Sequence, residues 1–296
     1  MHQKDVPGLL AGLLAEAGLP DDPAREPMRI WAHSGVERLR FPGRGTMVFK
    51  YAEAPCDREH LALRLAARRG LPVPRVQAAH GEGGVLGMLM DDLGKPNREA
   101  YDYDGVCAAV RLHQVSGATW LARINTAGLA AMPRRIGVRL KRLGLPAVAG
   151  PIRSLKGAAA SRAAGAELPP YGLCHSQYHP TSLHIGQRGW HLLDFARACT
   201  GPGLLDLASW YGTLNAPSPA RTRGLIESYV AAGGPRQALA ARGGLDAASW
   251  ALGWHRVWVA DWFAQQVDRG WADGAEDIWT SAITRHLNEA ATLLKT

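Results

Sequence analysis

The chain has 296 residues, enough for one large domain or two ordinary ones, and a chain of this length buries about 75% of its unfolded surface. Hydrophobic residues make up 47% and charged residues 20%, which excludes wholesale disorder and removes any need for disulfide or metal staples. The net charge is +8, and no apolar run approaches the ~18 residues of a membrane helix, nor does a basic head precede an apolar run at the N-terminus. We therefore expect a cytoplasmic protein with no membrane segment, complete from Met1.

The N-terminal part of the chain alternates short strand-like runs with two helices. A first helix is expected over residues 6–17, followed by a proline-rich link at Pro20, Pro23 and Pro27. The later elements are three strands over 28–31, 36–41 and 46–51, a helix over 57–69, and two strands over 73–78 and 85–90. This pattern predicts a small antiparallel sheet with a helix, ending at a linker near residue 92.

Beyond that linker the pattern is mostly helical and rich in Ala and Leu, with one exception. Two apolar runs, 183–185 and 190–193, flank Gly186-Gln187-Arg188-Gly189, which is typical of a hairpin. We therefore predict an α+β protein of two lobes: residues 1–92 as a small sheet-plus-helix lobe and residues 93–296 as a larger, mostly helical lobe that carries the hairpin.

The positive charge is concentrated in one region. Residues 105–166 contain no Asp or Glu but ten basic side chains, and removing those ten from the 34 of the chain leaves 24 basic against 26 acidic residues. A solvated basic face and a docking surface for an anionic partner are equally compatible with this pattern. Aromatic residues interleave poorly with these arginines, so binding to nucleic acid is not expected. The four cysteines have no metal-type or redox-type spacing and are expected to be buried free thiols.

Two N-terminal residues indicate a nucleotide site. Lys50 lies inside the apolar run 47–52, where an ammonium needs a partner because its burial alone costs several kcal/mol. Glu59, in the first turn of the next expected helix, is a candidate partner. A strand lysine held by a helix glutamate is the arrangement with which kinase folds bind nucleotide phosphates. Edge-strand lysines are common, however, and Glu59 also suits the positive end of a helix on its own.

A second cluster lies in the helical part. The polar run 174–182 includes His175, Gln177, His179 and Ser182 and precedes the hairpin, and Asp194 ends its second strand, where a carboxylate is costly unless it binds a cation or a donor. Asp206 is expected to stabilise the start of a helix and to brace the loop before it.

Four tryptophans, Trp250, Trp254, Trp258 and Trp262, recur every four residues near the C-terminus. This spacing places them on one stripe of a helix. Such a stripe is more often core than a ligand platform, which is the alternative.

The run from His175 to Ala208 resembles the aminoglycoside phosphotransferase family, whose signature is H-G-D-x-H-P-x-N, a short hairpin, I-D-W or I-D-F, and G-D-P-x-x-D-L-A. Lys50, the Arg58-Glu59 helix, the run 70–74 and the run 90–94 resemble its N-terminal lobe in the same order. The resemblance spans nearly the whole chain and implies a protein-kinase-like bilobal fold. Its departures include two functional positions, since Gln177 replaces the catalytic aspartate and Ser182 replaces the metal-binding asparagine.

The resemblance also implies roles for individual residues. Lys50, held by Glu59, would bind the phosphates of ATP or GTP, and Asp194 would hold Mg²⁺, with Ser182 as a weaker oxygen ligand. Ser34, Gly35, Met90 and Asp92 would border the nucleotide. A glutamine amide accepts a hydrogen bond from an attacking hydroxyl but cannot take its proton, so His175 or His179 is a candidate replacement base beside Gln177.

Two functions follow as expectations. The first is a nucleotide-dependent phosphotransferase acting on a hydroxyl of a small-molecule natural product or on a peptide Ser or Thr, in a biosynthetic pathway, with an anionic acceptor meeting the 105–166 region. Strings of acidic residues that would hold a polycationic aminoglycoside are not obvious in the sequence. The alternative is a catalytically impaired, pseudokinase-like scaffold that binds nucleotide or an anionic peptide for a partner enzyme.

Overall fold

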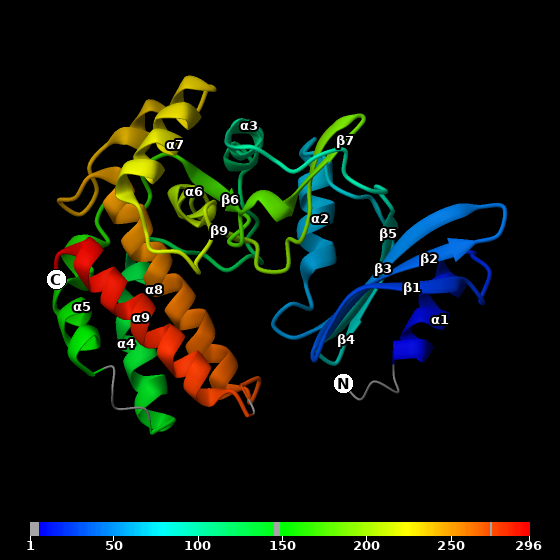
Figure 1. Ribbon diagram of the computed structural model, residues 1–296, viewed down its shortest axis with the longest axis horizontal. Coiled ribbons are helices and arrows are strands. Elements are labelled where there is room, and N and C mark those ends of the chain that lie inside the picture. The colour runs from blue at the N-terminus through cyan, green and yellow to red at the C-terminus, as the bar shows by residue number, and fades with distance from the viewer. Residues whose placement is uncertain (1–5, 145–148, 273) are drawn as a thin grey trace. The chain divides into compact units, whose positions relative to one another are not determined.

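The computed structural model describes residues 6–144, 149–272 and 274–296, which form two compact units (Figure 1). The first unit comprises Met1–Tyr101 and Thr181–Ala198, and the second comprises Asp102–Pro180 and Cys199–Thr296. The expected combination of an antiparallel-sheet N-terminal part and a helical C-terminal part is confirmed. The expected division into residues 1–92 and 93–296 differs in two respects: the first unit continues to Tyr101, and it also includes Thr181–Ala198, the segment that contains the hairpin.

The first unit is built on a five-stranded antiparallel sheet with the order β1-β2-β3-β5-β4. Its elements are α1 (Val6–Glu16), β1 (Ala24–Trp31), β2 (Ser34–Phe41), β3 (Gly45–Glu53), α2 (Glu59–Arg68), β4 (Val76–Glu82), β5 (Val85–Asp91), β7 (Leu183–Gly186) and β8 (Gly189–Leu192). The apolar side of α1 packs on β4 and β5, and Leu10, Leu13 and Leu14 join one buried core with residues of the sheet. A helix as short as α1 is only marginally stable when isolated in water, and burial of this leucine face explains why it forms here.

The strand β1 begins earlier than expected and includes Pro27, which the sequence assigned to a proline-rich link. Two features of the structure explain why proline is tolerated. The strand β1 is at the edge of the sheet, and its register against β2 shifts between Pro27 and Arg29. An edge strand with a bulge does not need the backbone N–H that proline lacks.

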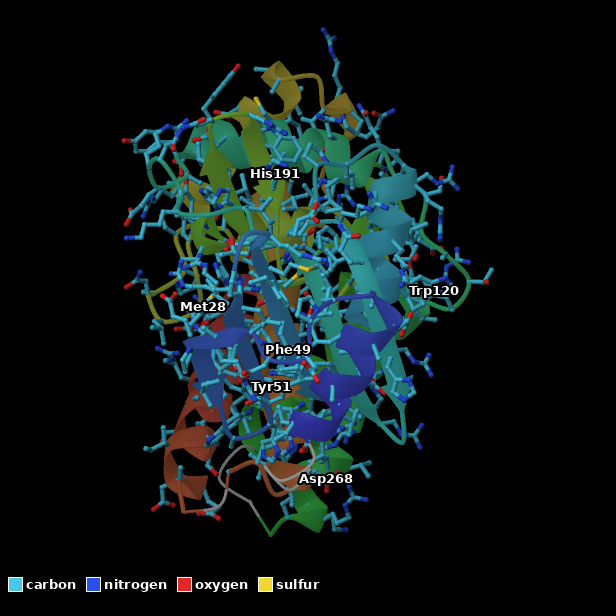
Figure 2. All side chains as sticks on the ribbon, turned by 90° about the vertical axis from the view of Figure 1, so that its right-hand side faces the viewer. Met28, Phe49, Tyr51, Trp120, His191 and Asp268 are labelled. Atoms are coloured by element: carbon cyan, nitrogen blue, oxygen red, sulfur yellow. The ribbon has the colours of Figure 1, made fainter. Side chains whose placement is uncertain are left out.

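Side chains along β3 alternate between the hydrophobic core on one face of the sheet and Lys50 on the other face. Phe49 and Tyr51 belong to the core formed with α1, and Figure 2 shows both beside that helix. Successive side chains of a strand point to opposite faces of the sheet, so Lys50 points to the other face. Gly35 lies opposite Tyr51 in β2, and a Cβ atom at Gly35 would lie 2.4 Å from the Tyr51 ring. Gly35 therefore makes room for Tyr51.

The second unit is mostly helical. Its elements are α3 (Asp102–His113), α4 (Thr126–Arg142), α5 (Ala149–Arg162), β6 (Tyr171–Cys174), β9 (Cys199–Pro202), α6 (Leu204–Ser209), α7 (Pro219–Ala231), α8 (Ala247–Asp268) and α9 (Glu276–Leu294), with a short 3₁₀ turn at Arg236–Leu239. A second 3₁₀ turn, Pro180–Ser182, begins at the last residue of this stretch of the second unit and continues into the first. The long helices α8 and α9 pack against each other, α4 packs on α8, and β6 pairs with β9. The position of this two-stranded ladder matters because the polar run 175–179 follows β6 directly.

The basic region does not leave all its charges to solvent. Arg135 and Arg139 contact the buried carboxylate of Asp261 at 3.3 and 3.1 Å, and Arg139 and Arg142 pair with Asp268 (labelled in Figure 2). These ion pairs join α4 to α8. Part of the positive charge therefore stabilises the packing of this unit, and the interpretation of the region as a docking surface for an anionic partner loses support.

The tryptophan stripe divides into two parts. Trp250 and Trp254 are completely buried, and both indole N–H groups donate to the carbonyl oxygen of Arg162. Trp258 and Trp262 are half-buried, and Trp262 meets Trp271 edge to face at 6.5 Å. The first half of the stripe is thus core, and the second half is partly accessible to solvent.

The cysteines are free thiols, as expected, although only Cys174 and Cys199 are buried while Cys56 and Cys107 are half-buried. Among the helices that the structure describes, none combines the length and the apolar character that crossing a bilayer requires.

We predict that Gly35→Ala lowers stability by about 1–3 kcal/mol, because the new methyl group displaces the Tyr51 ring from a packed core. The measurement is urea unfolding followed by circular dichroism. Gly12→Ala is the matched control, since nothing lies within 4 Å of its Cβ position in the middle of α1, and it should raise stability by about 0.5–1 kcal/mol. The explanation fails if Gly35→Ala costs as much in a Tyr51→Leu background as alone.

Candidate functional site

The first unit brings together three residues that the sequence had placed in separate motifs. The Nζ atom of Lys50 lies 2.6 Å from Oε2 of Glu59 and 2.7 Å from Oδ1 of Asp194. Lys50 comes from β3, Glu59 from the first turn of α2, and Asp194 from the loop after β8. We call these three residues the Lys50 cluster.

The three members of the Lys50 cluster differ in exposure. The side chains of Lys50 and Glu59 are 10% and 1% exposed, whereas that of Asp194 is 50% exposed. Burial alone would lower the pKa of the Lys50 ammonium, but the two carboxylates outweigh it and hold that pKa above its ordinary value. Lys50 is therefore a permanent cation, anchored by a buried carboxylate and facing an accessible one.

The backbone at Asp194 is unusual. Its φ is 62°, in the left-handed region that side chains other than Gly, Asn and Asp rarely adopt. The residue before it is fixed, because the N–H of Leu193 donates to the carbonyl oxygen of Ser182 at 2.9 Å, and Glu59 accepts a hydrogen bond from the backbone of Phe195 after it. This anchoring on both sides directs the Asp194 carboxylate to Lys50.

The other residues expected to border a nucleotide also lie in the first unit. Ser34 and Gly35 begin β2 directly after the two-residue turn from β1, and Met90 is half-buried in β5 between Val48 of β3 and Val76 of β4. The turn between β1 and β2 is held by the Nδ1 atom of His33, 3.0 Å from Oε2 of Glu53.

Asp92 has a structural partner that the sequence did not indicate. Its carboxylate accepts from Nε of Arg38 at 2.6 Å and from the N–H of Gly94 at 2.9 Å. Burial would raise the pKa of Asp92, but the hydrogen bonds from Arg38 and Gly94 hold it below its ordinary range. The Asp92 side chain thus fixes the turn after β5.

The second unit contains the 175–179 loop. His175 is completely buried, and its Nδ1 atom accepts the N–H of Gln177 at 3.3 Å. Tyr178 is also completely buried, with its hydroxyl donating to the carbonyl oxygen of Gly105. Gln177 and His179 are half-buried. The loop therefore presents Gln177 between two anchored neighbours.

Asp206 holds this loop in place through hydrogen bonds to its backbone. Its carboxylate is completely buried and accepts the N–H of His175 at 2.7 Å and the N–H of Ser176 at 2.8 Å, and His113 lies at 3.3 Å. The position before α6 is occupied by Gly203, which makes no side-chain cap. Of the two roles expected for Asp206, the structure shows hydrogen bonds to the loop.

Ser176 was not singled out from the sequence as a functional residue. Its φ is 68°, and its Oγ atom lies 3.1 Å from Sγ of Cys199, which stands opposite Cys174 in the β6–β9 ladder. The available signal was the family signature, which has glycine at this position. Serine here accepts a left-handed backbone, and the hydrogen bonds of Asp206 to the loop offset that strain.

We predict that Asp206→Asn lowers stability by about 2–3 kcal/mol, because one buried N–H then faces an amide NH₂ in place of a carboxylate oxygen. Denaturant unfolding measures this loss. Asp246→Asn is the matched control, since Asp246 caps α8 at a partly exposed position where asparagine serves equally well. Equal stability of the two variants would contradict the bracing role of Asp206.

Comparisons with known proteins agree with this architecture. Residues 38–247 match the model of the phosphotransferase enzyme family. No curated protein sequence matches the chain. Among solved structures, a putative aminoglycoside phosphotransferase from Ralstonia eutropha JMP134 is 12% identical with a TM-score of 0.65, covering 97% of this chain and 98% of the other.

Two further structures are similar over most of their length. A macrolide 2′-phosphotransferase from Brachybacterium faecium is 18% identical with a TM-score of 0.63, covering 94% of this chain and 98% of the other. An amicoumacin kinase in complex with AMP-PNP and Ca²⁺ is 12% identical with a TM-score of 0.57, covering 98% and 96%. At these identities the structures show a common kinase-like fold. The family match spans most of the sequence, and the chain belongs to the phosphotransferase enzyme family.

Proposed function

We propose that this chain is a phosphotransferase that moves the γ-phosphoryl group of ATP or GTP to a hydroxyl of a small molecule. The observation that carries the proposal is the Lys50 cluster, in which an ammonium is held by one buried carboxylate and faces one accessible carboxylate. A nucleotide site needs a fixed cation for the phosphates and an oxygen donor for a divalent ion, and the cluster offers both.

Each member of the cluster has a distinct task in this proposal. Glu59 holds the Lys50 side chain in position, and Lys50 binds phosphate oxygens. The donor chemistry at Asp194 fits a hard divalent cation such as Mg²⁺, because its half-exposed carboxylate offers oxygen as a ligand. When bound, the ion neutralises charge on the phosphates. Ser34, Gly35 and the backbone of Met90 and Asp92 would border the nucleotide.

Gln177 would align the acceptor. The hydroxyl oxygen forms a bond to the γ-phosphorus while the bond from that phosphorus to the leaving oxygen breaks, and positioning contributes most to such a loose transition state. The amide oxygen of Gln177 can accept the hydrogen bond of the hydroxyl but cannot take its proton. A missing general base typically costs about 10² to 10⁴-fold, so we expect slow but real turnover.

The two histidines of the loop are not equivalent candidates for the missing base. His175 is completely buried and uses Nδ1 to accept the N–H of Gln177, so we assign it to positioning the loop. His179 is half-buried and is the histidine that we retain as a candidate proton acceptor.

The contacts of the second unit bear on the acceptor. Asp261 and Asp268 are engaged by arginines of α4, which leaves them poorly suited to bind a polycationic aminoglycoside. Half-buried aromatic rings, among them Trp258, Trp262 and Trp271, favour a flat or apolar acceptor. We therefore favour a small natural product over a peptide Ser or Thr. The four free thiols suit a reducing compartment, in keeping with a cytoplasmic location.

The second candidate is a nucleotide-binding scaffold that serves a partner enzyme. It is favoured by one observation, the amide at position 177 where the family has its catalytic carboxylate. The two candidates share the nucleotide site and differ only in turnover.

We predict that Lys50→Met weakens the binding of MgATP and MgGTP by at least about tenfold, because the phosphates lose a charge-assisted contact. Isothermal titration calorimetry measures the change, and Lys156→Ala, at an exposed site on α5, is the control that leaves binding intact. The double variant Lys50→Met/Glu59→Gln removes the buried unpaired carboxylate and keeps the test valid if the single variant unfolds. Unchanged affinity in folded Lys50→Met protein would refute the nucleotide site.

A second prediction separates enzyme from scaffold. Phosphate release from MgATP, with water as the acceptor, should be slow but measurable in the native protein, absent in Asp194→Ala, and faster by about 10² to 10⁴-fold in Gln177→Asp, which regains a general base. Gln187→Asp, in the exposed β7–β8 turn, is the control for added charge. A native protein that binds nucleotide without any turnover, while Gln177→Asp is active, would support the scaffold.

A further inference from the structure

The oxygen ligands near the Lys50 cluster limit how many divalent cations can bind there together with a nucleotide. We propose that this site binds its nucleotide with a single divalent cation, held on the protein side by Asp194 alone, and that Ser182 is not a metal ligand. The proposal rests on the proposed nucleotide-binding function and deepens it. It differs from the expectation from the sequence, in which the hydroxyl of Ser182 was an oxygen ligand of Mg²⁺.

The two positions that would hold metal ions differ in their chemistry. Protein kinases hold two Mg²⁺ ions with the carboxylate after the hairpin and the amide of an asparagine in the catalytic loop. A serine at the second position carries a hydroxyl that reaches less far from the backbone than an asparagine carbonyl and is a weaker donor. Because it is a serine, residue 182 is a poorer ligand for a second ion than the asparagine of the family signature.

Ser182 lies in an enclosed position with a fixed backbone. The residue closes the 3₁₀ turn Pro180–Ser182 and is only 2% exposed. Its carbonyl oxygen accepts the N–H of Leu193 at 2.9 Å, which ties its backbone to the segment that presents Asp194. The backbone of Ser182 is thus fixed, and its short, enclosed side chain can reach only the positions that rotation about a single χ angle allows.

The described residues offer Asp194 little help in binding a metal ion. Across residues 6–144, 149–272 and 274–296, no three His, Cys, Asp or Glu side chains are grouped so that they could hold a metal ion. Glu59 is buried and committed to Lys50 at 2.6 Å. A cation here would therefore take one carboxylate from Asp194 and complete its shell with phosphate oxygens and water, which is a common arrangement for Mg²⁺.

The Lys50 ammonium lies beside both carboxylates of the cluster. Its Nζ atom is 2.7 Å from Oδ1 of Asp194 and 2.6 Å from Oε2 of Glu59, so a cationic side chain already contacts the Asp194 carboxylate. This ammonium can neutralise phosphate oxygens without a second ion. The same carboxylate contact also means that a cation bound by Asp194 shares its ligand with Lys50, which further disfavours two ions at this position.

The test counts bound ions directly. Mn²⁺ binding is measured by electron paramagnetic resonance at saturating AMP-PNP, with nucleotide binding measured separately by calorimetry. We expect about one Mn²⁺ per bound AMP-PNP in the native protein, about one in Ser182→Ala, and about two in Ser182→Asn, which regains the amide. Ser154→Asn, exposed on α5, is the matched control and should keep the native count.

The outcomes distinguish the two proposals. Two Mn²⁺ ions per nucleotide in the native protein, or none while AMP-PNP is bound, would overturn the single-ion site and leave the nucleotide site standing. Loss of the ion in Ser182→Ala would show that the hydroxyl is a ligand and would also overturn it. If AMP-PNP does not bind the native protein at all, the proposed function fails and the single-ion site fails with it. The number of Mn²⁺ ions per bound AMP-PNP in the native protein tests the single-ion site even if Ser182→Asn does not fold.

Discussion

The contact of the Lys50 ammonium with Glu59 and Asp194 is the constraint on which the site depends. A lysine buried in a sheet is costly unless carboxylates compensate it, and each carboxylate here comes from a different element. To bring them together, α2 must begin at Glu59 and the segment after β8 must adopt a left-handed backbone at Asp194. Much of the first unit can be understood as support for this contact: α1 and the apolar face of β3 build the core that leaves the other face for Lys50.

In the second unit, too, a buried carboxylate is compensated by its partners, which here are backbone N–H groups. Asp206 is buried, and its oxygens accept the backbone N–H groups of His175 and Ser176 in the 175–179 loop. In the function that we propose, this carboxylate supports a phosphotransferase loop in which Gln177 stands where the family signature has its catalytic aspartate. This combination is why we propose a slow enzyme, with a scaffold as the alternative.

Local patterns in the sequence predicted the elements well and the long-range partners poorly. The apolar run around Lys50 and the helix at Glu59 were predicted from periodicity, and the motif resemblance placed Asp194. The extension of β1 through Pro27 was missed because a proline is tolerated there only at a bulged sheet edge, which is a property of the assembled sheet. The pairing of Asp92 with Arg38 joins residues 54 positions apart, and no local pattern indicates such a partner.

The most direct test of the account is a crystal structure of the protein grown with AMP-PNP and Mg²⁺. The account predicts phosphate oxygens at about 3 Å from Nζ of Lys50, with Glu59 still paired to the ammonium and Asp194 at the ion. A nucleotide bound away from Lys50, or an ammonium that keeps both carboxylates while the phosphates lie elsewhere, would contradict it.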